Sequence, residues 1–194
     1  VDEMLVKKFS ISNKIAQMNH TKEIKILFLA RLEKEKGIFE TIDAVATLIQ
    51  KGLSVSLSIA GDGEIMDELK QYAHKKNLKK NSFYFLGYVK NNDKIKAFTD
   101  HHIFCFPTYY GEGLPTSVLE AMAFGLPVVT RPVGGIADFF KDGKMGLLVH
   151  GKCSEEIAER LEKLIQNRQT MFKISEHNAE YAKNNFMASI VAKR

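Results

Sequence analysis

The sequence predicts an α/β protein with an open parallel sheet that carries helices on both faces. Short apolar segments alternate along the chain with longer segments whose apolar residues recur at helical spacing. Glycines or charged clusters separate most of these segments. Strands that alternate with helices in this way are joined by right-handed crossovers, so the strands run parallel and helices cover both sides of the sheet.

The composition is that of one globular domain. Of the 194 residues, 45% are hydrophobic and 26% are charged, which argues against a disordered chain. No apolar run approaches the ~20 residues of a membrane span, and the first residues do not resemble a secretory signal. The two cysteines, Cys105 and Cys153, are too few for a disulfide scaffold or a four-ligand zinc site. We therefore expect a cytoplasmic protein.

The charge is modestly basic, with 28 Lys and Arg against 23 Asp and Glu and a formal net charge of +5. This balance favours an anionic ligand or surface. Charge alone leaves nucleic acid open as a partner. Basic and acidic residues are interleaved, however, as in Glu33-Lys34-Glu35-Lys36, which is typical of a solvated face.

The first half of the chain contains three predicted strand–helix units. The segment before Thr21 is polar, and we expect residues 1–22 to form an irregular interdomain or edge segment, with the domain itself at residues 23–194. Residues 24–30 are apolar and bounded by charge, as in a buried strand. Further strands are expected at residues 53–60 and 82–86, and helices at residues 38–49, 64–76 and 93–100.

The second half repeats the alternation. Strands are expected at residues 103–106, 127–130 and 146–149, and helices at residues 116–124 and 154–166, with more helix to the end. Ser154 is the expected N-cap of the helix at 154–166, because Glu155 and Glu156 then occupy its first turn. Ligands of such sheets bind beyond the carboxyl ends of the strands, so the loops that follow the strands are the candidate site.

The loop after the first strand carries two cations. Arg31 and Lys36 bracket a turn whose Gly37 opens the next helix. Fixed positive charge beside the N-terminus of a helix suits a phosphate group. An ordinary charged surface turn explains the same residues equally well, so position alone leaves both interpretations open.

The next two loops are less informative. Gly61-Asp62-Gly63 resembles a dinucleotide-binding fingerprint, but Met66 stands where that fingerprint has its third glycine, and no Walker-type Gly-Lys-Ser/Thr follows. A tight turn is the better interpretation, and a nicotinamide-dependent redox enzyme is disfavoured. Gly87, Tyr88 and Val89 follow the third strand and belong to the same edge of the sheet.

The loop at residues 107–115 and the helix after it contain two glutamates. Glu112 lies between two glycines, and Glu120 lies inside an apolar helix that begins near Pro115. The N–H groups of Thr116 and Ser117 then stand at the helix start. A carboxylate in so apolar a helix needs a partner, and sugar or ribose hydroxyls are suitable donors.

Four motifs occur in a fixed order between residues 24 and 149. They are Ala30-Arg31-Leu32 with Lys36-Gly37, Ile59-Ala60-Gly61-Asp62-Gly63, Phe85-Leu86-Gly87, and Glu112-Gly113 with Glu120-Ala121-Met122-Ala123, Gly125 to Val129 and Gly134-Gly135. This pattern resembles the family 4 (group 1) retaining glycosyltransferases of the GT-B fold. Small departures are Ala30, where the family often has glycine, and Asp138, where it often has glutamate.

The resemblance covers only the C-terminal, Rossmann-like half of that fold. It implies that this domain binds a nucleoside-diphosphate sugar, while an N-terminal domain of the same full-length protein holds the acceptor, and that no metal is obligatory. It also implies a peripheral contact of the full-length enzyme with the cytoplasmic face of a membrane, and no nucleic-acid partner. The catalytic residues it implies are Arg31, Lys36 and Glu112, and the donor-binding residues are Gly87, Tyr88, Val89, Gly113, Leu114, Pro115, Thr116, Ser117 and Glu120.

Two other interpretations remain. A sugar-nucleotide-binding module without transfer activity would use the same residues. A basic domain for nucleic acid or a membrane surface would bind polyanions in a salt-dependent manner and would be indifferent to Glu120.

The adjacent His101 and His102 point to opposite faces of a strand and cannot share a metal, and Cys105 lies in an apolar strand as a core residue.

Overall fold

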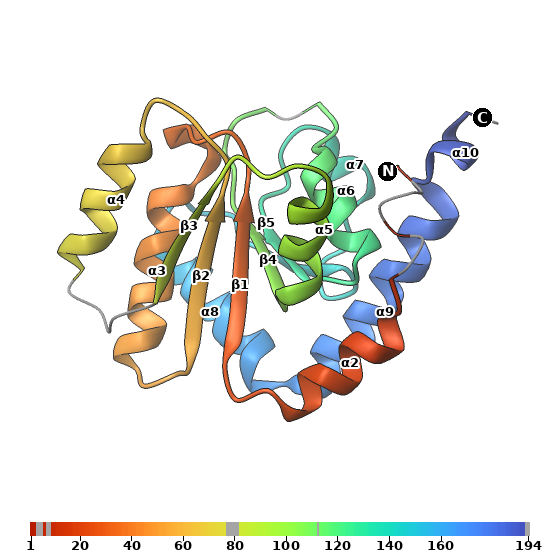
Figure 1. Cartoon of the computed structure of the whole chain (residues 1–194), viewed down its shortest axis with the longest axis horizontal. Coiled ribbons are helices and arrows are strands. Elements are labelled where there is room, and N and C mark those ends of the chain that lie inside the picture. The colour runs from red at the N-terminus through yellow and green to blue at the C-terminus, as the bar shows by residue number, and fades with distance from the viewer. Residues whose placement is uncertain (3–5, 7–8, 77–81, 112, 193–194) are drawn as a thin grey trace.

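The computed structural model describes residues 1–2, 6, 9–76, 82–111 and 113–192, and it confirms the predicted α/β fold (Figure 1). All strands of its six-stranded sheet run parallel, in the order β3-β2-β1-β4-β5-β6. The strands are β1 (Ile24–Leu29), β2 (Val55–Ala60), β3 (Phe83–Gly87), β4 (Ile103–Phe106), β5 (Val128–Thr130) and β6 (Gly146–Leu148).

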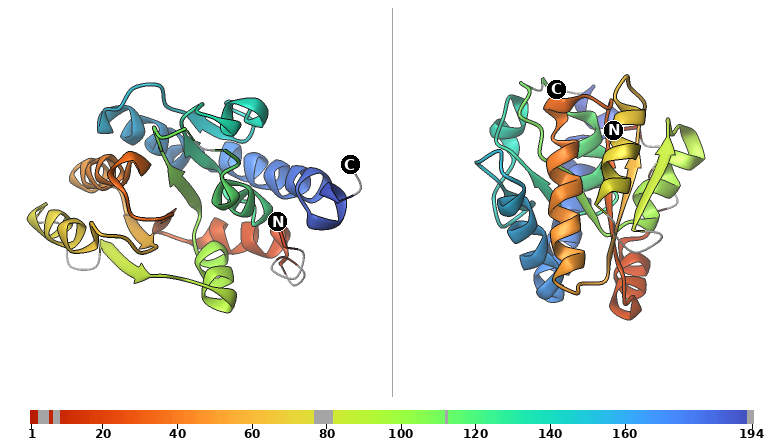
Figure 2. Two further views of the ribbon diagram at one scale, coloured as in Figure 1. Left: turned by 90° about the horizontal axis from the view of Figure 1, so that it is seen from above. Right: turned by 90° about the vertical axis from the view of Figure 1, so that its left-hand side faces the viewer.

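Helices cover both faces of this sheet. In chain order they are α2 (Ile11–His20), α3 (Ile38–Gln50), α4 (Met66–Lys75), α5 (Asn91–Asp100), α6 (Thr116–Ala123), α7 (Gly135–Phe139), α8 (Ser154–Gln166), α9 (Arg168–Asn185) and α10 (Ala188–Val191), with a short 3-10 turn η1 (Lys34–Lys36) before α3. Helices α3, α4 and α8 lie on one side, and α2, α5, α6 and α9 lie on the other (Figure 2). Within the described residues, no helix is long and apolar enough to cross a membrane.

The central strands are buried because they are covered from both sides. Every residue of β2 and of β4 is buried, as expected for strands of a parallel sheet between two helical layers. At the edge, burial along β3 alternates between half-buried and exposed residues, so Tyr84 and Leu86 face solvent. On the α5 side, the ring of Phe98 stacks on that of Phe124 with ring centroids 5.3 Å apart, which packs α5 against the end of α6.

The strand order reverses direction between β1 and β4. From β1 the chain winds outward to β2 and β3, and from β4 it winds outward on the other side to β5 and β6. The loops that leave β1 and β4 therefore diverge, and a crevice opens between them at the carboxyl ends of the strands. This is the predicted position of the ligand site.

The segment before β1 is helical, so the expectation of an irregular segment is wrong for residues 11–20. Ser10 caps α2 by accepting a hydrogen bond from the N–H of Asn13 (3.4 Å), and α2 packs against α9. The signal was the spacing of Ile11, Ile15 and Met18, which places three apolar side chains on one helix face. The division between residues 1–22 and 23–194 stays a prediction.

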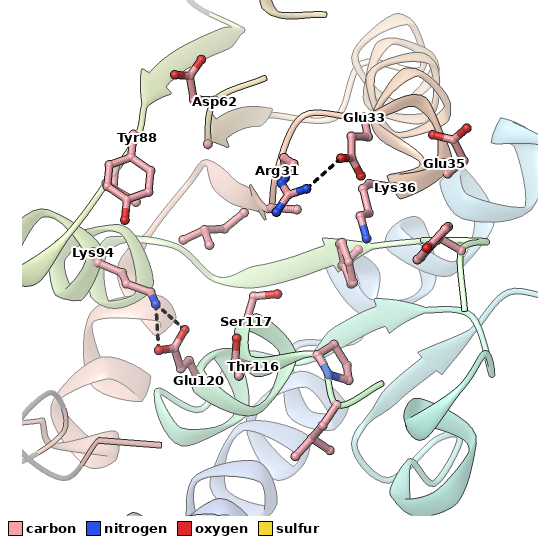
Figure 3. Close-up of a pocket in the computed structure, with 18 residues that line it drawn as sticks. Arg31, Glu33, Glu35, Lys36, Asp62, Tyr88, Lys94, Thr116, Ser117 and Glu120 are labelled. Carbon is pink, nitrogen blue, oxygen red and sulfur yellow. Dashed lines mark hydrogen bonds and ion pairs between the residues drawn. The ribbon is translucent and has the colours of Figure 1, made fainter. Parts of the chain in front are cut away.

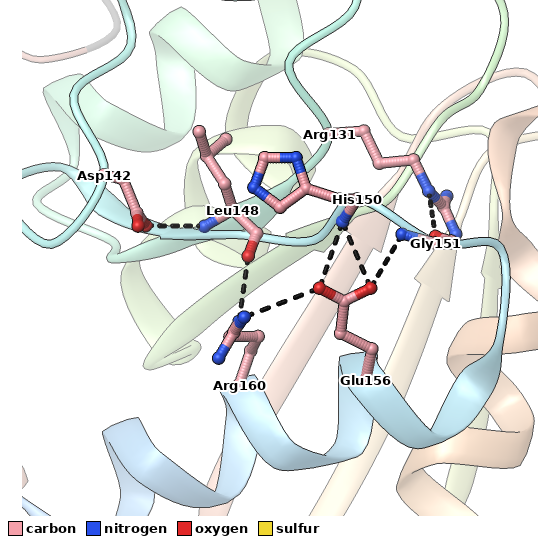
Figure 4. A network of polar contacts seen from close by, with 7 residues as sticks. All are labelled: Arg131, Asp142, Leu148, His150, Gly151, Glu156 and Arg160. Carbon is pink, nitrogen blue, oxygen red and sulfur yellow. Dashed lines mark hydrogen bonds and ion pairs between the residues drawn. The ribbon is translucent and has the colours of Figure 1, made fainter.

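The start of α8 also differs from the prediction. Ser154 is the first residue of the helix and not its cap, and the cap position falls on Cys153. Instead, the carboxylate of Glu156 reaches back and accepts hydrogen bonds from the N–H groups of His150 (3.1 Å) and Gly151 (2.7 Å), as Figure 4 shows. The Arg131 guanidinium donates to the carbonyl of Gly151 from the other side (2.8 Å). The loop after β6 is therefore held by side chains of α8 and of the loop after β5.

Backbone hydrogen bonds extend the sheet into the loops after β1, β2 and β3. The N–H of Leu32 donates to the carbonyl of Asp62 (2.9 Å), and the N–H of Gly61 donates to the carbonyl of Gly87 (2.8 Å). This approach requires glycine at position 61, because a Cβ atom there would overlap the carbonyl oxygen of Ala30 and φ is +137°. Gly61, where a tight turn is predicted, is thus the point of closest contact between the loops after β1 and β2.

We expect Gly61→Ala to lower the free energy of unfolding by about 3 kcal/mol, since it adds both backbone strain and overlap with Ala30. Gly52→Ala is the matched control, because Gly52 has φ +86° but no atom within 4 Å of the added Cβ. Its cost should be only the strain of a left-handed residue, about 1–2 kcal/mol. Urea denaturation of both variants measures the difference, and equal losses would show that the contact with Ala30 is not limiting.

A buried lysine joins α2 to α5. Lys14 is 4% exposed, and its ammonium donates to the carbonyl of Phe98 in the last turn of α5 (2.7 Å). Burial lowers the pKa of Lys14 from 10.5 to about 7, and the carboxylate of Asp100 opposes part of this shift. Between pH 7 and pH 10.5, Lys14 is therefore mostly protonated in the unfolded chain and mostly neutral in the folded protein.

The stability of the parent protein relative to Lys14→Met should therefore increase with pH above about 7. One proton corresponds to at most about 1.4 kcal/mol per pH unit. Urea denaturation of both proteins between pH 6 and pH 9.5 measures this difference, which should be flat below pH 7. The exposed Lys22 supplies the control, since Lys22→Met should give a profile parallel to that of the parent. If the stability of Lys14→Met also changes with pH in parallel with that of the parent, the lowered pKa of Lys14 is contradicted.

Candidate functional site

A cavity of about 950 Å³ occupies the crevice at the carboxyl ends of the strands. Figure 3 shows the 18 residues that line it. They come from the ends of β1 and β4, from the loops after β1 to β4 and from α5 and α6. The residues are Leu29, Ala30, Arg31, Glu33, Glu35, Lys36, Gly61, Asp62, Tyr88, Val89, Lys94, Phe106, Tyr110, Leu114, Pro115, Thr116, Ser117 and Glu120. A cavity of this size accepts a ligand as large as a nucleotide.

The loop after β1 supplies one wall. Arg31 is 77% exposed on its side chain and pairs with Glu33 (Nη1 to Oε1, 3.3 Å). The ammonium of Lys36 lies 4.7 Å from the ring centroid of Tyr110, which directs it toward the cavity (Figure 3). Both predicted cations of this loop therefore border the same space.

The walls on the two sides of the crevice are tied together through the carbonyl of Glu35. It accepts hydrogen bonds from the N–H of Tyr109 (3.0 Å) and from the hydroxyl of Thr108 (3.3 Å), both in the loop after β4. At the turn into α3, Gly37 has φ +78°, and a Cβ atom there would meet the carbonyl of Pro107. The loops after β1 and β4 are thus fixed relative to each other by their backbones.

The N-terminus of α6, which follows the loop after β4, borders the cavity. Val118 and Leu119 donate to the carbonyl of Pro115 (3.0 and 3.3 Å), so the N–H groups of Thr116 and Ser117 precede the first hydrogen bonds of the helix. No side chain in the described part of the chain caps this helix, and its first turn contains no acidic residue. The partial positive charge of the helix terminus is therefore available to an anion.

Glu120 has a protein partner that the sequence analysis missed. Its carboxylate lies against the ammonium of Lys94 in the first turn of α5, at 2.8 Å from Oε1 and 2.7 Å from Oε2. The side chains of Lys94 and Glu120 are 25% and 11% exposed. The expectation that this carboxylate needs a partner was correct in its physics, but a lysine fills that role in addition to any ligand hydroxyl. The sequence carries no signal for this pair, because Lys94 and Glu120 lie 26 residues apart on two different helices.

The structure brings most of the predicted site residues together. Those that line the cavity are Arg31, Lys36, Tyr88, Val89, Leu114, Pro115, Thr116, Ser117 and Glu120. Gly87 and Gly113 are not part of the lining, but their carbonyls accept hydrogen bonds from Gly61 (2.8 Å) and Gly135 (3.0 Å) and so shape the loops. Glu112 lies outside the described residues.

The two histidines before β4 have structural partners. His101 shares a hydrogen bond of 2.6 Å with the carbonyl of Ala97, and Nδ1 of His102 accepts from the N–H of Lys25 (2.9 Å). Burial lowers the pKa of His101 to about 4 and that of His102 to about 3, so both are neutral at pH 7. No cluster of three potential metal ligands occurs among the residues that the structure describes. Cys105 is a core residue, as predicted, and burial raises the pKa of its thiol to about 12.

Two kinds of chemistry meet in the cavity. On one side are the cations Arg31 and Lys36 and the N-terminus of α6, which suit phosphate oxygens. On the other side are the Lys94–Glu120 ion pair and the exposed ring of Tyr88, which suit hydroxyl groups and a flat ring (Figure 3). The arrangement fits an elongated ligand that carries phosphates at one end and hydroxyls at the other.

Comparison with known proteins gives a consistent result. The family model for "Glycosyl transferases group 1" matches residues 10–185. The chain is 33% identical over 166 residues to the uncharacterized glycosyltransferase MJ1069 of Methanocaldococcus jannaschii, covering 84% of this chain and 42% of that protein. It is 27% identical to the capsular polysaccharide biosynthesis glycosyltransferase CapM of Staphylococcus aureus, covering 95% of this chain and 49% of CapM.

Solved structures show the same fold. The crystal structure of Anabaena HepE in complex with UDP-glucose superposes with a TM-score of 0.80 and 25% identity, over 94% of this chain and 50% of HepE. The chain therefore spans about half the length of the curated relatives and of the solved structure that it matches.

Proposed function

Because the chain belongs to the family of group 1 glycosyl transferases, we propose that it forms the donor-binding domain of a glycosyltransferase and binds a nucleoside-diphosphate sugar. The observation that carries this proposal is the cavity, in which Arg31, Lys36 and the N-terminus of α6 lie opposite the Lys94–Glu120 ion pair. HepE, which shares the fold, was solved with UDP-glucose.

In this proposal the diphosphate lies between the loop after β1 and the start of α6. Arg31, Lys36 and the N–H groups of Thr116 and Ser117 donate to its oxygens. When the bond from the anomeric carbon to the phosphate oxygen breaks, the electron pair leaves with the diphosphate, and these donors stabilise the negative charge that develops there. The fixed cations supply the charge that a metal ion would otherwise provide, so no metal is obligatory.

The remainder of the donor is assigned to the other walls. The nucleoside lies along Tyr88 and Val89, in the loop that Gly87 shapes, with the ribose hydroxyls at Glu120. Leu114 and Pro115, in the loop that Gly113 shapes, border the transferred sugar, and Glu112 binds its hydroxyls. Transfer proceeds with retention of the anomeric configuration to a saccharide or lipid-linked acceptor. That acceptor is held by an N-terminal domain of the full-length protein, in the cytoplasm and in peripheral contact with the membrane.

The proposal is tested by calorimetric titration of the chain with UDP, GDP, ADP and their sugars. At least one diphosphate should bind, and Lys36→Ala and Arg31→Ala should each weaken it by about 1.5–3 kcal/mol, the usual value of a hydrogen bond to a charged group. The loss for Arg31→Ala should lie at the lower end of this range, because Arg31 must give up part of its ion pair with Glu33 to bind the diphosphate.

Lys34→Ala is the matched control for this loop. Lys34 lies in the same 3-10 turn, but it pairs with Glu68 (3.2 Å) and is not part of the cavity lining. It should bind the diphosphate as the parent does, and affinity for the nucleoside without phosphates should barely change in any of the three variants. Parent-like diphosphate binding by Arg31→Ala and Lys36→Ala would refute the phosphate assignment.

Glu120→Gln tests the ribose assignment. The substitution keeps the shape of the side chain and removes the charge that strengthens hydrogen bonds from hydroxyls. Affinity should fall for the ribonucleotide and fall less for its 2′-deoxy analogue, with a coupling of about 0.5–3 kcal/mol between substitution and hydroxyl. Glu159→Gln on the exposed face of α8 is the control, and thermal unfolding verifies the fold of both variants. Strictly additive effects would place the ribose elsewhere.

A further inference from the structure

The Lys94–Glu120 pair retains hydrogen-bonding capacity on the cavity side. An ammonium has three donors, and a carboxylate has about four acceptor positions, so one contact to each oxygen does not saturate either group. Oε2 of Glu120 is buried, and its 2.7 Å approach to Lys94 is an ion pair without the geometry of a hydrogen bond. Both side chains line the cavity (Figure 3).

A hydroxyl group is complementary to such a pair. It donates its hydrogen to the carboxylate and accepts a hydrogen bond from the ammonium through its oxygen. A lone carboxylate can use only the first of these interactions. A site built to bind a hydroxyl in this way discriminates strongly against the analogue that lacks it, because both protein groups then lose a partner.

We propose that Lys94 is a specificity-determining residue that, together with Glu120, selects ribose over deoxyribose in the ligand. The assignment rests on the proposed function, because it takes the ligand to be a nucleoside diphosphate. Lys94 donates to the 2′-oxygen while Glu120 accepts from the 2′-hydroxyl. The ammonium also orients the carboxylate before the ligand arrives.

The contacts of α5 separate this role from a structural one. The helix is held at its other end by Lys14, which donates to the carbonyl of Phe98 (2.7 Å), and by the stacking of Phe98 on Phe124. Contacts that do not involve Lys94 therefore also hold α5 in place. Lys94 is 25% exposed but Glu120 is buried, so loss of Lys94 leaves the carboxylate without this partner, and the thermal unfolding of each variant is measured beside its binding.

The test uses UDP, GDP and ADP with their 2′-deoxy analogues. Lys94→Met keeps the length and the apolar stem of the side chain, Lys94→Arg keeps the charge, and Lys96→Met is the matched control on an exposed position of the same helix. Calorimetry gives the dissociation constants of each protein for each pair of ligands, and thermal unfolding verifies the fold.

For the diphosphate that binds the parent best, Lys94→Met should weaken the ribonucleotide about tenfold and the 2′-deoxy analogue about twofold or less. Lys94→Arg should restore part of the discrimination, and Lys96→Met should behave as the parent. Equal losses for both sugars, or tighter ribonucleotide binding by Lys94→Met, would overturn the role of Lys94 while leaving the proposed function intact. A parent protein that binds none of the diphosphates would overturn the proposed function and this assignment together.

Discussion

The adjacency of β1 and β4 at the centre of the sheet is the constraint on which the site depends. Because the chain leaves β1 in one direction and β4 in the other, the loops after these strands cannot pack over the sheet end between them. The crevice that results is closed at its base by the carbonyl of Glu35, which accepts hydrogen bonds from Thr108 and Tyr109. Cations from one half of the sheet and a helix N-terminus from the other half therefore face the same cavity.

Close backbone contacts give this crevice its rigidity. Gly61 lies against Ala30, and Gly37 lies against Pro107, in each case closer than a residue with a Cβ atom would allow. The hydrogen bond from the N–H of Leu32 to the carbonyl of Asp62 continues the pairing of β1 and β2 beyond the strands. The loops are thus held mainly through main-chain atoms, and their side chains remain directed at the cavity and at solvent.

The fold could be predicted because each strand and most helices have a recognisable local sequence pattern. Apolar runs and helical spacing indicate each strand and most helices, and a parallel sheet follows from their alternation. Helix α2 was missed because its apolar face is only three residues wide in a polar segment. Helix α7 was missed because five residues are too short for a periodicity to emerge.

The site was predictable only in part. Arg31, Lys36 and the start of α6 could be placed together because strand ends converge at one edge of a parallel sheet. Lys94 could not, because its partner Glu120 is 26 residues away and on a different helix, and only the packing of α5 beside α6 brings the two charges together. Pairs of this kind depend on how each helix is rotated about its own axis in the fold, which composition and spacing do not determine.

The glycine contacts also bear on how proteins of this architecture diversify. Positions whose Cβ atom would collide with a neighbouring loop, such as Gly61 and Gly37, tolerate no side chain without a rearrangement of the backbone. Tyr88 and Lys94 also line the cavity, and exchange of their side chains adds no atom to these glycine contacts. New ligand preferences can therefore arise on an unchanged scaffold, and they will be concentrated on the β3–α5 side of the cavity, where no glycine contact restricts substitution at these two residues.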